Sequence, residues 1–235
     1  MSERLWSTPL PGLLLTLAAY ELARAVQRRG GEHPLLNPVA LSAALVIAVL
    51  QLLDVSYARY ADSARLLLWL LGPATVALAV PLARELPRLS RLAWPVLVAV
   101  TAGAFTSIIS AVLLARWTGA SELLVRSLAP KSATTPIAIG IAEKVGAAPE
   151  LTAALVVASG IVGATFGPLL LDLLGTRDPR VRGIATGTAA HGIGTASLYR
   201  TSPEASAYSG LAMGLSGLIT ALLVPWLLQL LGAGS

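Results

Sequence analysis

The sequence has no cysteine, and only two of its 235 residues are histidines, His33 and His191. The absence of cysteine excludes disulfides, thiol catalysis and cysteine-ligated zinc or iron–sulfur sites. Two histidines so far apart in the chain also provide no histidine-rich motif for a metal ion. We therefore expect the protein to have neither a bound metal nor a cofactor.

Charged residues are scarce as well, at 12% of the chain against 55% apolar residues. Soluble domains carry about a quarter charged residues, so this chain has roughly half the usual supply for a surface in water. A net charge of +5 would suggest nucleic acid in a soluble protein, but in a membrane protein basic residues gather in cytoplasmic loops. We predict a multi-pass protein of the cell (plasma or inner) membrane, embedded in the lipid bilayer, that binds no nucleic acid.

Hydrolytic and nucleotide-binding motifs are missing too. The chain has no Gly-x-Ser-x-Gly elbow, no His-Glu-x-x-His zinc motif and no Gly-x-x-x-x-Gly-Lys-Ser/Thr loop for phosphate. The lack of that phosphate loop argues against a self-contained ATP-driven pump. Because the charge-free spans also supply no acid–base pair at membrane depth, we expect that the protein is not an enzyme.

Long apolar runs, in contrast, are abundant. A helix needs about 20 mostly apolar residues to cross the hydrocarbon core of a bilayer. Six segments meet or approach that length, and each is predicted to be a regular transmembrane helix: residues 5–20 (continuing to 26), 34–53, 66–83, 92–115, 151–171 and 205–231.

Two weaker segments, residues 123–145 and 183–199, are apolar on average but interrupted by proline, glycine, threonine and single ionisable residues. Irregular backbone at membrane depth is tolerated only where it is buried in protein or lines a wet cavity. We predict that both are broken or re-entrant. The predicted fold class is therefore an all-α integral membrane protein with about six regular transmembrane helices and two broken or re-entrant segments, in a single polytopic membrane domain (residues 1–235).

An internal repeat is indicated by residues 72–83 and 131–142, which align without a gap. Ala79 then coincides with Ala138, and Ala83 with Ala142. Small-residue composition alone could also produce these matches. A true repeat would matter, because paired segments interrupted by glycine or proline mark the central site of many transporters.

The stretch from Pro130 to Pro136 is the strongest local signal of a binding site. Its two prolines remove backbone donors and break the helix. A helix restarting after Pro136 would point its positive N-terminal end at the same place, which favours an anion. The predicted ligands in this stretch are Lys131, Ser132, Thr134 and Thr135. The alternative is that Lys131 lies at the outer interface and extends to water.

His191 is the only ionisable residue inside the glycine-rich second broken segment. Histidine titrates near neutral pH, so His191 is a candidate for binding a carboxylate and for proton coupling. The alternative is a neutral histidine bonded to a facing carbonyl group. Gly192 and Thr195 complete the predicted substrate site in this segment, while Asn37, before Pro38, is predicted either to cap a helix or to bind substrate.

The last span carries Gly210, Gly214 and Gly217, which we assign to close helix packing. The same small residues offer a face for a second copy of the chain. We expect a homo-oligomer, with a dimer as the simplest form.

Six segments resemble hallmark sequences of the LrgB/CidB family. They include Pro-Lys-Ser-Ala-Thr-Thr-Pro-Ile-Ala at 130–138 and Gly-Thr-Ala-Ala-His-Gly-Ile-Gly-Thr-Ala at 187–196, and the others lie at 35–38, 70–82, 166–168 and 210–215. The resemblance extends from about residue 10 to about residue 230. The family usually has serine where this chain has Ala190, so one hydroxyl group is missing here.

The resemblance implies two functions. Bacterial members are named as holins or antiholins that act with a small LrgA/CidA-like membrane partner, whereas plant plastid members exchange glycolate and glycerate and some bacterial members are linked to pyruvate uptake. A lysis pore needs no lysine, histidine and hydroxyl groups gathered between broken helices. We therefore predict a transporter of small organic carboxylates (the glycolate, glycerate, pyruvate or lactate class), by secondary active transport or exchange. The alternative is a holin/antiholin-like protein that modulates murein hydrolase activity and cell lysis with that small partner.

Overall fold

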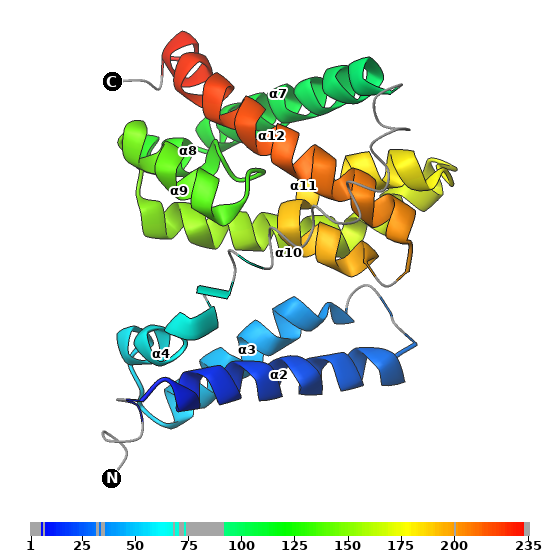
Figure 1. Ribbon diagram of the computed structural model, residues 1–235. Helices are drawn as coiled ribbons and strands as arrows, with labels where there is room; N and C mark the ends of the chain where they lie inside the picture. The colour runs from blue at the N-terminus through cyan, green and yellow to red at the C-terminus, as the bar shows by residue number, and fades with distance from the viewer. Residues whose placement is uncertain are drawn as a thin grey trace. The chain divides into compact units, whose positions relative to one another are not determined.

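The structure is a computed structural model that describes residues 6, 8–31, 33, 36–67, 69, 70, 73, 92–199 and 201–232. Within these ranges every regular element is a helix (Figure 1). The chain divides into two compact units, Met1–Ala79 and Val80–Ser235, which we describe separately. The all-α fold is thus confirmed for the described residues, and the single membrane domain stays a prediction.

The first unit contains α2 (Leu10–Arg29), α3 (Pro38–Leu52) and α4 (Tyr57–Ser63). Helix α2 packs against both α3 and α4. Asn37 caps α3, because its side-chain Oδ1 accepts hydrogen bonds from the backbone N–H groups of Val39 (2.9 Å) and Ala40 (3.2 Å). The capping role predicted for Asn37 is therefore confirmed, while a role in binding stays a prediction.

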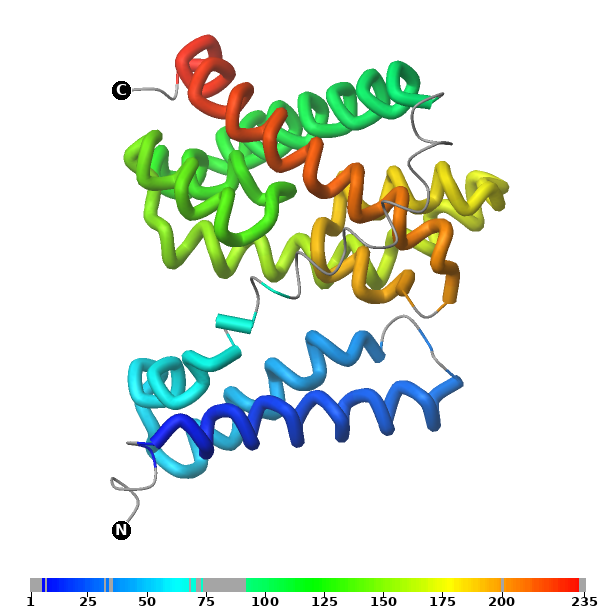
Figure 2. The backbone as a smooth tube through the Cα atoms, in the orientation of Figure 1, coloured from blue at the N-terminus to red at the C-terminus, as the bar shows by residue number. Residues whose placement is uncertain are grey.

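The second unit contains six of the described helices, and α11 packs against three of its neighbours, α7, α10 and α12 (Figures 1 and 2). The helices are α7 (Ala93–Trp117), α8 (Glu122–Leu128), α9 (Thr135–Lys144), α10 (Pro149–Leu173), α11 (Pro179–Leu198) and α12 (Pro203–Leu230). Four of them, α9 to α12, have proline in the first turn, where its missing N–H group leaves no hydrogen bond unmade. A core of Ile108, Val112, Val224 and Leu227 joins α7 to α12.

Three described helices, α7, α10 and α12, are long and apolar enough to cross a membrane, and the pair α3–α4, bent by 120°, would make a fourth span if it counts as one. The described residues therefore contain fewer candidate spans than the six regular spans that the sequence predicts. Helix α2 forms, but Glu21, Arg24 and two further arginines make its C-terminal half too polar. The predicted span at 34–53 ends at Leu52 and bends away, and most of the predicted span at 66–83 lies outside the described residues.

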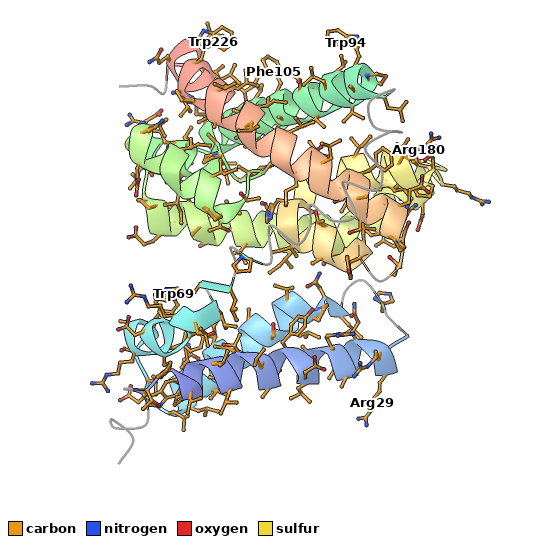
Figure 3. All side chains as sticks on the ribbon, viewed as in Figure 1. Arg29, Trp69, Trp94, Phe105, Arg180 and Trp226 are labelled. Atoms are coloured by element: carbon orange, nitrogen blue, oxygen red, sulfur yellow. The ribbon has the colours of Figure 1, made fainter. Side chains whose placement is uncertain are left out.

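The candidate spans expose large apolar side chains of the kind that contact lipid. Trp94 and Phe105 on α7 are 73% and 41% exposed, and Trp226 on α12 is 55% exposed. Figure 3 shows these three side chains on the outer face of the second unit. A soluble monomer rarely exposes so much contiguous apolar surface, so these faces fit the bilayer.

Both weaker segments are broken, as predicted. Helices α8 and α9 are separated by residues 129–134, which form turns and bends instead of continuing the helix. Helix α11 is interrupted at His191, whose φ of 40° and ψ of −132° are not helical. The repeat involves residues 72–83, of which only Pro73 is described, so the comparison with 131–142 lies outside the described residues.

Glycines set how closely α11 and α12 approach. A Cβ atom on Gly183 or Gly187 would overlap the backbone carbonyl oxygen of Ala205 or Ser209, respectively. Glycine at these two positions therefore lets the backbones of α11 and α12 approach closely.

The assignment of the α12 glycines to close packing is confirmed only in part. A Cβ on Gly217 would lie 2.7 Å from Ile137 Cδ1, so Gly217 is closely packed as predicted. For Gly210 and Gly214 the assignment stays a prediction, because nothing in the described structure lies within 4 Å of an added Cβ.

Candidate functional site

A cavity of about 650 Å³ lies between α7 and α11 and reaches the break between α8 and α9. One face of α7, with Leu92, Val96, Ala99, Gly103 and Ser107 at intervals of about four residues, forms one wall. Helix α11 forms the opposite wall. The remaining lining residues among those described are Pro95, Lys131, Ser132, Asp178, Arg180, Val181, Ile184, Ala185, Thr188 and Ala189.

Lys131 lies at the deep end of this cavity, in a triangle of hydrogen bonds with two serines. Its Nζ donates to Ser107 Oγ (2.8 Å) and to Ser132 Oγ (3.2 Å), and the two hydroxyl oxygens lie 2.6 Å apart. The turn after Pro130 makes this possible, because it brings Lys131 and Ser132 against the side of α7. The structure thus brings two predicted site residues together with Ser107.

Among the residues that the structure describes, the triangle leaves two hydrogen-bond donors unused. A protonated lysine has three N–H donors and uses two of them here. One serine hydroxyl donates to the other, so the second serine keeps a free O–H donor. One ammonium N–H and one hydroxyl O–H therefore remain, and they match the two oxygens of a single carboxylate.

Lys131 forms no ion pair with an acidic side chain in the described part of the chain. A charged amine away from bulk water needs a partner of opposite charge or several hydrogen bonds, since its desolvation is expensive. Two serine hydroxyls compensate it only in part. The deep end of the cavity is therefore suited to an anion.

His191 lies on the other side of α11, away from the described lining of the cavity, and is 4% exposed. Its ring nitrogen Nε2 lies 2.9 Å from the backbone carbonyl oxygen of Val156 on α10. A carbonyl oxygen only accepts, so Nε2 carries the proton and donates. Room for the ring comes from Gly160, where a Cβ would lie 2.5 Å from His191 Cε1. The structure therefore matches the alternative prediction for His191, a histidine bonded to a facing carbonyl group.

A hydrogen-bonded connection nevertheless links His191 to the lysine turn. The hydroxyl of Ser159 on α10 lies 2.7 Å from the backbone oxygen of Lys131 and 3.0 Å from that of Val156. Its single proton is shared between these two oxygens, and Val156 O also accepts from His191. A shift of the histidine ring would thus change the bonds that hold the turn at Lys131.

The other predicted site residues have different surroundings. Thr195 Oγ1 donates to the carbonyl oxygen of His191 (2.7 Å) and lies 2.8 Å from Ser209 Oγ, so it stabilises the break in α11 against α12. Thr134 and Thr135 are half-buried at the start of α9, where Thr134 is the N-cap residue. Gly192 is half-buried beside Met213, and Asn37 belongs to the first unit.

Sequence reasoning missed Ser107, which supplies one corner of the lysine triangle. The available signal was the run Ala99, Gly103 and Ser107, whose small side chains recur every four residues on one face of the charge-free run 92–115. A polar residue that continues a stripe of small residues indicates a face that does not contact lipid.

The other end of the cavity carries an ion pair that sequence reasoning also missed. Asp178 is the N-cap of α11, and its carboxylate accepts from Arg180 Nη2 (2.6 Å) and Nε (3.0 Å). These side-chain bonds hold the pKa of Asp178 at about 2. Figure 3 shows Arg180 extending outward at this end of the second unit. The cavity therefore runs from an exposed ion pair to a half-buried amine.

A family model described as the LrgB-like family matches residues 16–230. Uncharacterized protein YwbG of Bacillus subtilis (strain 168) is 33% identical over 92% of this chain and 96% of its own length. Antiholin-like protein LrgB of Bacillus cereus (strain B4264) is 27% identical over 96% of this chain and 98% of its own length. No solved structure matches. The resemblance found in the sequence is thus confirmed over nearly the full length, and the chain belongs to the LrgB-like family of membrane proteins.

Proposed function

We propose that this protein transports small organic carboxylates of the glycolate, glycerate, pyruvate or lactate class, by secondary active transport or exchange. The observation that supports this most directly is the pair of unused donors at Lys131 and the serines, at the deep end of a cavity. The carboxylate accepts one hydrogen bond from the ammonium and one from the free hydroxyl. Charge-assisted bonds of this kind are roughly twice as strong as neutral ones.

A substrate hydroxyl or keto group has a partner on the opposite wall. Thr188 Oγ1 lines the cavity and donates to Ile184 O (2.8 Å), which leaves its lone pairs able to accept from a substrate hydroxyl. In the proposal, the other predicted ligands are secondary and bind the substrate only after the protein changes conformation. They are Thr134, Thr135, Gly192, Thr195 and Asn37.

His191 is proposed to couple transport to protons. Protonation of the ring adds a positive charge beside the Val156 carbonyl, and the shared proton of Ser159 carries the resulting shift to the backbone of Lys131. This is a mechanical coupling, since His191 itself lies behind the described wall of the cavity.

The His191→Gln variant tests this coupling, because glutamine keeps an N–H donor for Val156 but does not titrate near neutral pH. We expect counterflow of substrate at equal pH on both sides to stay within about threefold of the unchanged protein, while accumulation driven by a pH gradient is lost. Tracer accumulation in proteoliposomes with and without a gradient measures both. Gradient-driven accumulation that survives in His191→Gln would remove the coupling role.

A second candidate function is supported by the names of the relatives. Several relatives that this chain matches over 98% of their length are named antiholin-like protein LrgB. These names favour a role in controlling murein hydrolase activity and lysis more directly than they favour transport. In that function the protein acts with a small LrgA/CidA-like membrane partner, and in either function it acts as a homo-oligomer.

Reconstitution separates the two functions. The purified protein, alone in liposomes, is followed with labelled glycolate, glycerate and pyruvate, and with a trapped dye as a leak control. Saturable counterflow without dye loss is the expected result for a carrier. Dye loss without substrate preference would support a holin-like pore, and activity that requires the small partner would support the antiholin-like function.

A further inference from the structure

Between its two polar ends the described lining of the cavity is almost entirely carbon. Val96, Ala99 and Gly103 of α7 face Val181, Ile184 and Ala185 of α11 across it. Thr188 is the polar exception, and its hydroxyl proton is already donated to Ile184 O. The polar groups are therefore segregated, with Lys131 and two serines at the deep end and the Asp178–Arg180 pair at the other.

The cavity is much larger than the short acids of the proposed function. Leu92 and Ser107, which both line it, are fifteen residues apart on α7, or about 22 Å at 1.5 Å per residue. Glycerate has seven non-hydrogen atoms, which fill at most about 200 Å³ if each takes the roughly 30 Å³ of a liquid water molecule. A two- or three-carbon acid at Lys131 would thus leave most of the 650 Å³ to water against apolar walls.

From this segregation we infer that the site also takes unbranched alkyl monocarboxylates of about six to ten carbons in all. The carboxylate binds Lys131 and a serine hydroxyl, and the tail runs between α7 and α11 toward Asp178 and Arg180. The inference rests on the proposed function for the carboxylate end alone. The tail follows from the apolar walls and the length of the cavity.

The length of the tail follows from helix geometry. Ala99 lies eight residues from Ser107 on α7, about 12 Å along the axis. Three bonds of an extended chain advance about 3.3–3.6 Å, so a ten-carbon acid reaches about 10–11 Å, close to the level of Ala99. Each methylene that leaves water raises affinity about fourfold, until the tail reaches the end of the apolar walls.

Titration calorimetry on the purified full chain in detergent, with glycolate, acetate, butyrate, hexanoate, octanoate and decanoate, tests this inference. Empty micelles and the Lys131→Met variant provide the correction for partition into detergent. We expect affinity to rise by about fourfold per methylene from butyrate to octanoate. We also expect 1-octanol, which lacks the charge, to bind at least tenfold more weakly than octanoate.

A bulky residue in the wall supplies the structural control. Ala99 and Ala102 are both exposed on α7, but only Ala99 lines the cavity, so Ala99→Phe narrows its apolar part while Ala102→Phe places the same bulk outside the described lining. The ratio of decanoate affinity to acetate affinity is expected to fall at least tenfold in Ala99→Phe and to stay unchanged in Ala102→Phe.

Three results would overturn the inference: affinity independent of chain length, equal effects of the two phenylalanine variants, or octanol binding as tightly as octanoate. The proposed function would survive any of these three results, provided that glycolate and acetate still bind and that their binding depends on Lys131. Binding of none of the acids, glycolate included, would overturn both.

Discussion

Replacing Lys131 with methionine is expected to reduce saturable carboxylate counterflow by at least about 30-fold. Lys131 Nζ supplies the only charge in its triangle with Ser107 and Ser132. Methionine keeps a side chain of similar length but no donor, so a bound carboxylate would lose its counter-charge. Removing one member of a buried, hydrogen-bonded charge pair typically costs about 2–5 kcal/mol, which is about 30-fold or more in affinity.

The chain provides a matched control for this substitution. Lys144 is the only other lysine, and it lies exposed at the end of α9. Lys144→Met therefore changes the net charge by the same amount and is expected to leave counterflow unchanged. If both methionine variants lost activity equally, the effect would come from total charge or from folding, and Lys131 would have no special role.

Two further substitutions in the triangle refine the test. Ser107→Ala removes one corner of the triangle and one of the two hydroxyls that bond Lys131 Nζ, so a loss of about fivefold to tenfold is expected, in keeping with about 1 kcal/mol for one hydrogen bond. Lys131→Arg keeps the charge, but its planar fork does not fit the two serine oxygens in the same way, and an intermediate loss is expected. Counterflow rates in proteoliposomes at matched protein density measure all of these variants.

Features that depend on local chemistry were predictable from the sequence. Pro130 and Pro136 break the backbone wherever they occur, and residues 129–134 do separate α8 from α9. The glycine-rich run likewise weakens α11, which is interrupted at His191. Three charge-free runs became α7, α10 and α12 because length and hydropathy alone decide whether a helix can span the bilayer.

Features that depend on tertiary contacts were not predictable in the same way. His191 and Lys131 were assigned to one site because both are ionisable residues in broken segments, yet α11 directs the His191 ring toward Val156 on α10. Which face of α11 meets α7 and which meets α10 is set by where small residues allow close approach. Ser107 was missed for the same reason, since its partners lie 24 and 25 residues later in the chain.

The small residues of α11 lead to a stability prediction. We expect Gly187→Ala to lower the midpoint of thermal unfolding in detergent by roughly 5–10 °C, because the added methyl group would force about 2–3 kcal/mol of overpacking. Its Cβ would overlap the carbonyl oxygen of Ser209 and lie 2.8 Å from the Cα of the same residue. These are backbone atoms of α12, so no side-chain rotation relieves the overlap.

Gly210→Ala is the matched control, since a Cβ there has nothing within 4 Å in the described structure. Alanine is favoured over glycine inside a helix by about 1 kcal/mol, so this variant should unfold at the same temperature or slightly higher. The two glycine-to-alanine changes are thus expected to differ in sign. Equal midpoints for both variants would contradict the close approach of α11 to α12.

A second-site variant distinguishes backbone contact from side-chain contact. Gly160→Ala is also expected to destabilise, but here the overlap is with the His191 ring, 2.5 Å from the added Cβ to Cε1. His191→Ala removes that ring, so the double variant should unfold at a higher temperature than Gly160→Ala alone. For Gly187→Ala, the change Ser209→Ala leaves the overlapped carbonyl in place and should restore nothing. The coupling free energy should therefore be large between Gly160→Ala and His191→Ala, because a side chain fills the interface of α10 with α11. It should be near zero between Gly187→Ala and Ser209→Ala, because backbone packs against backbone between α11 and α12.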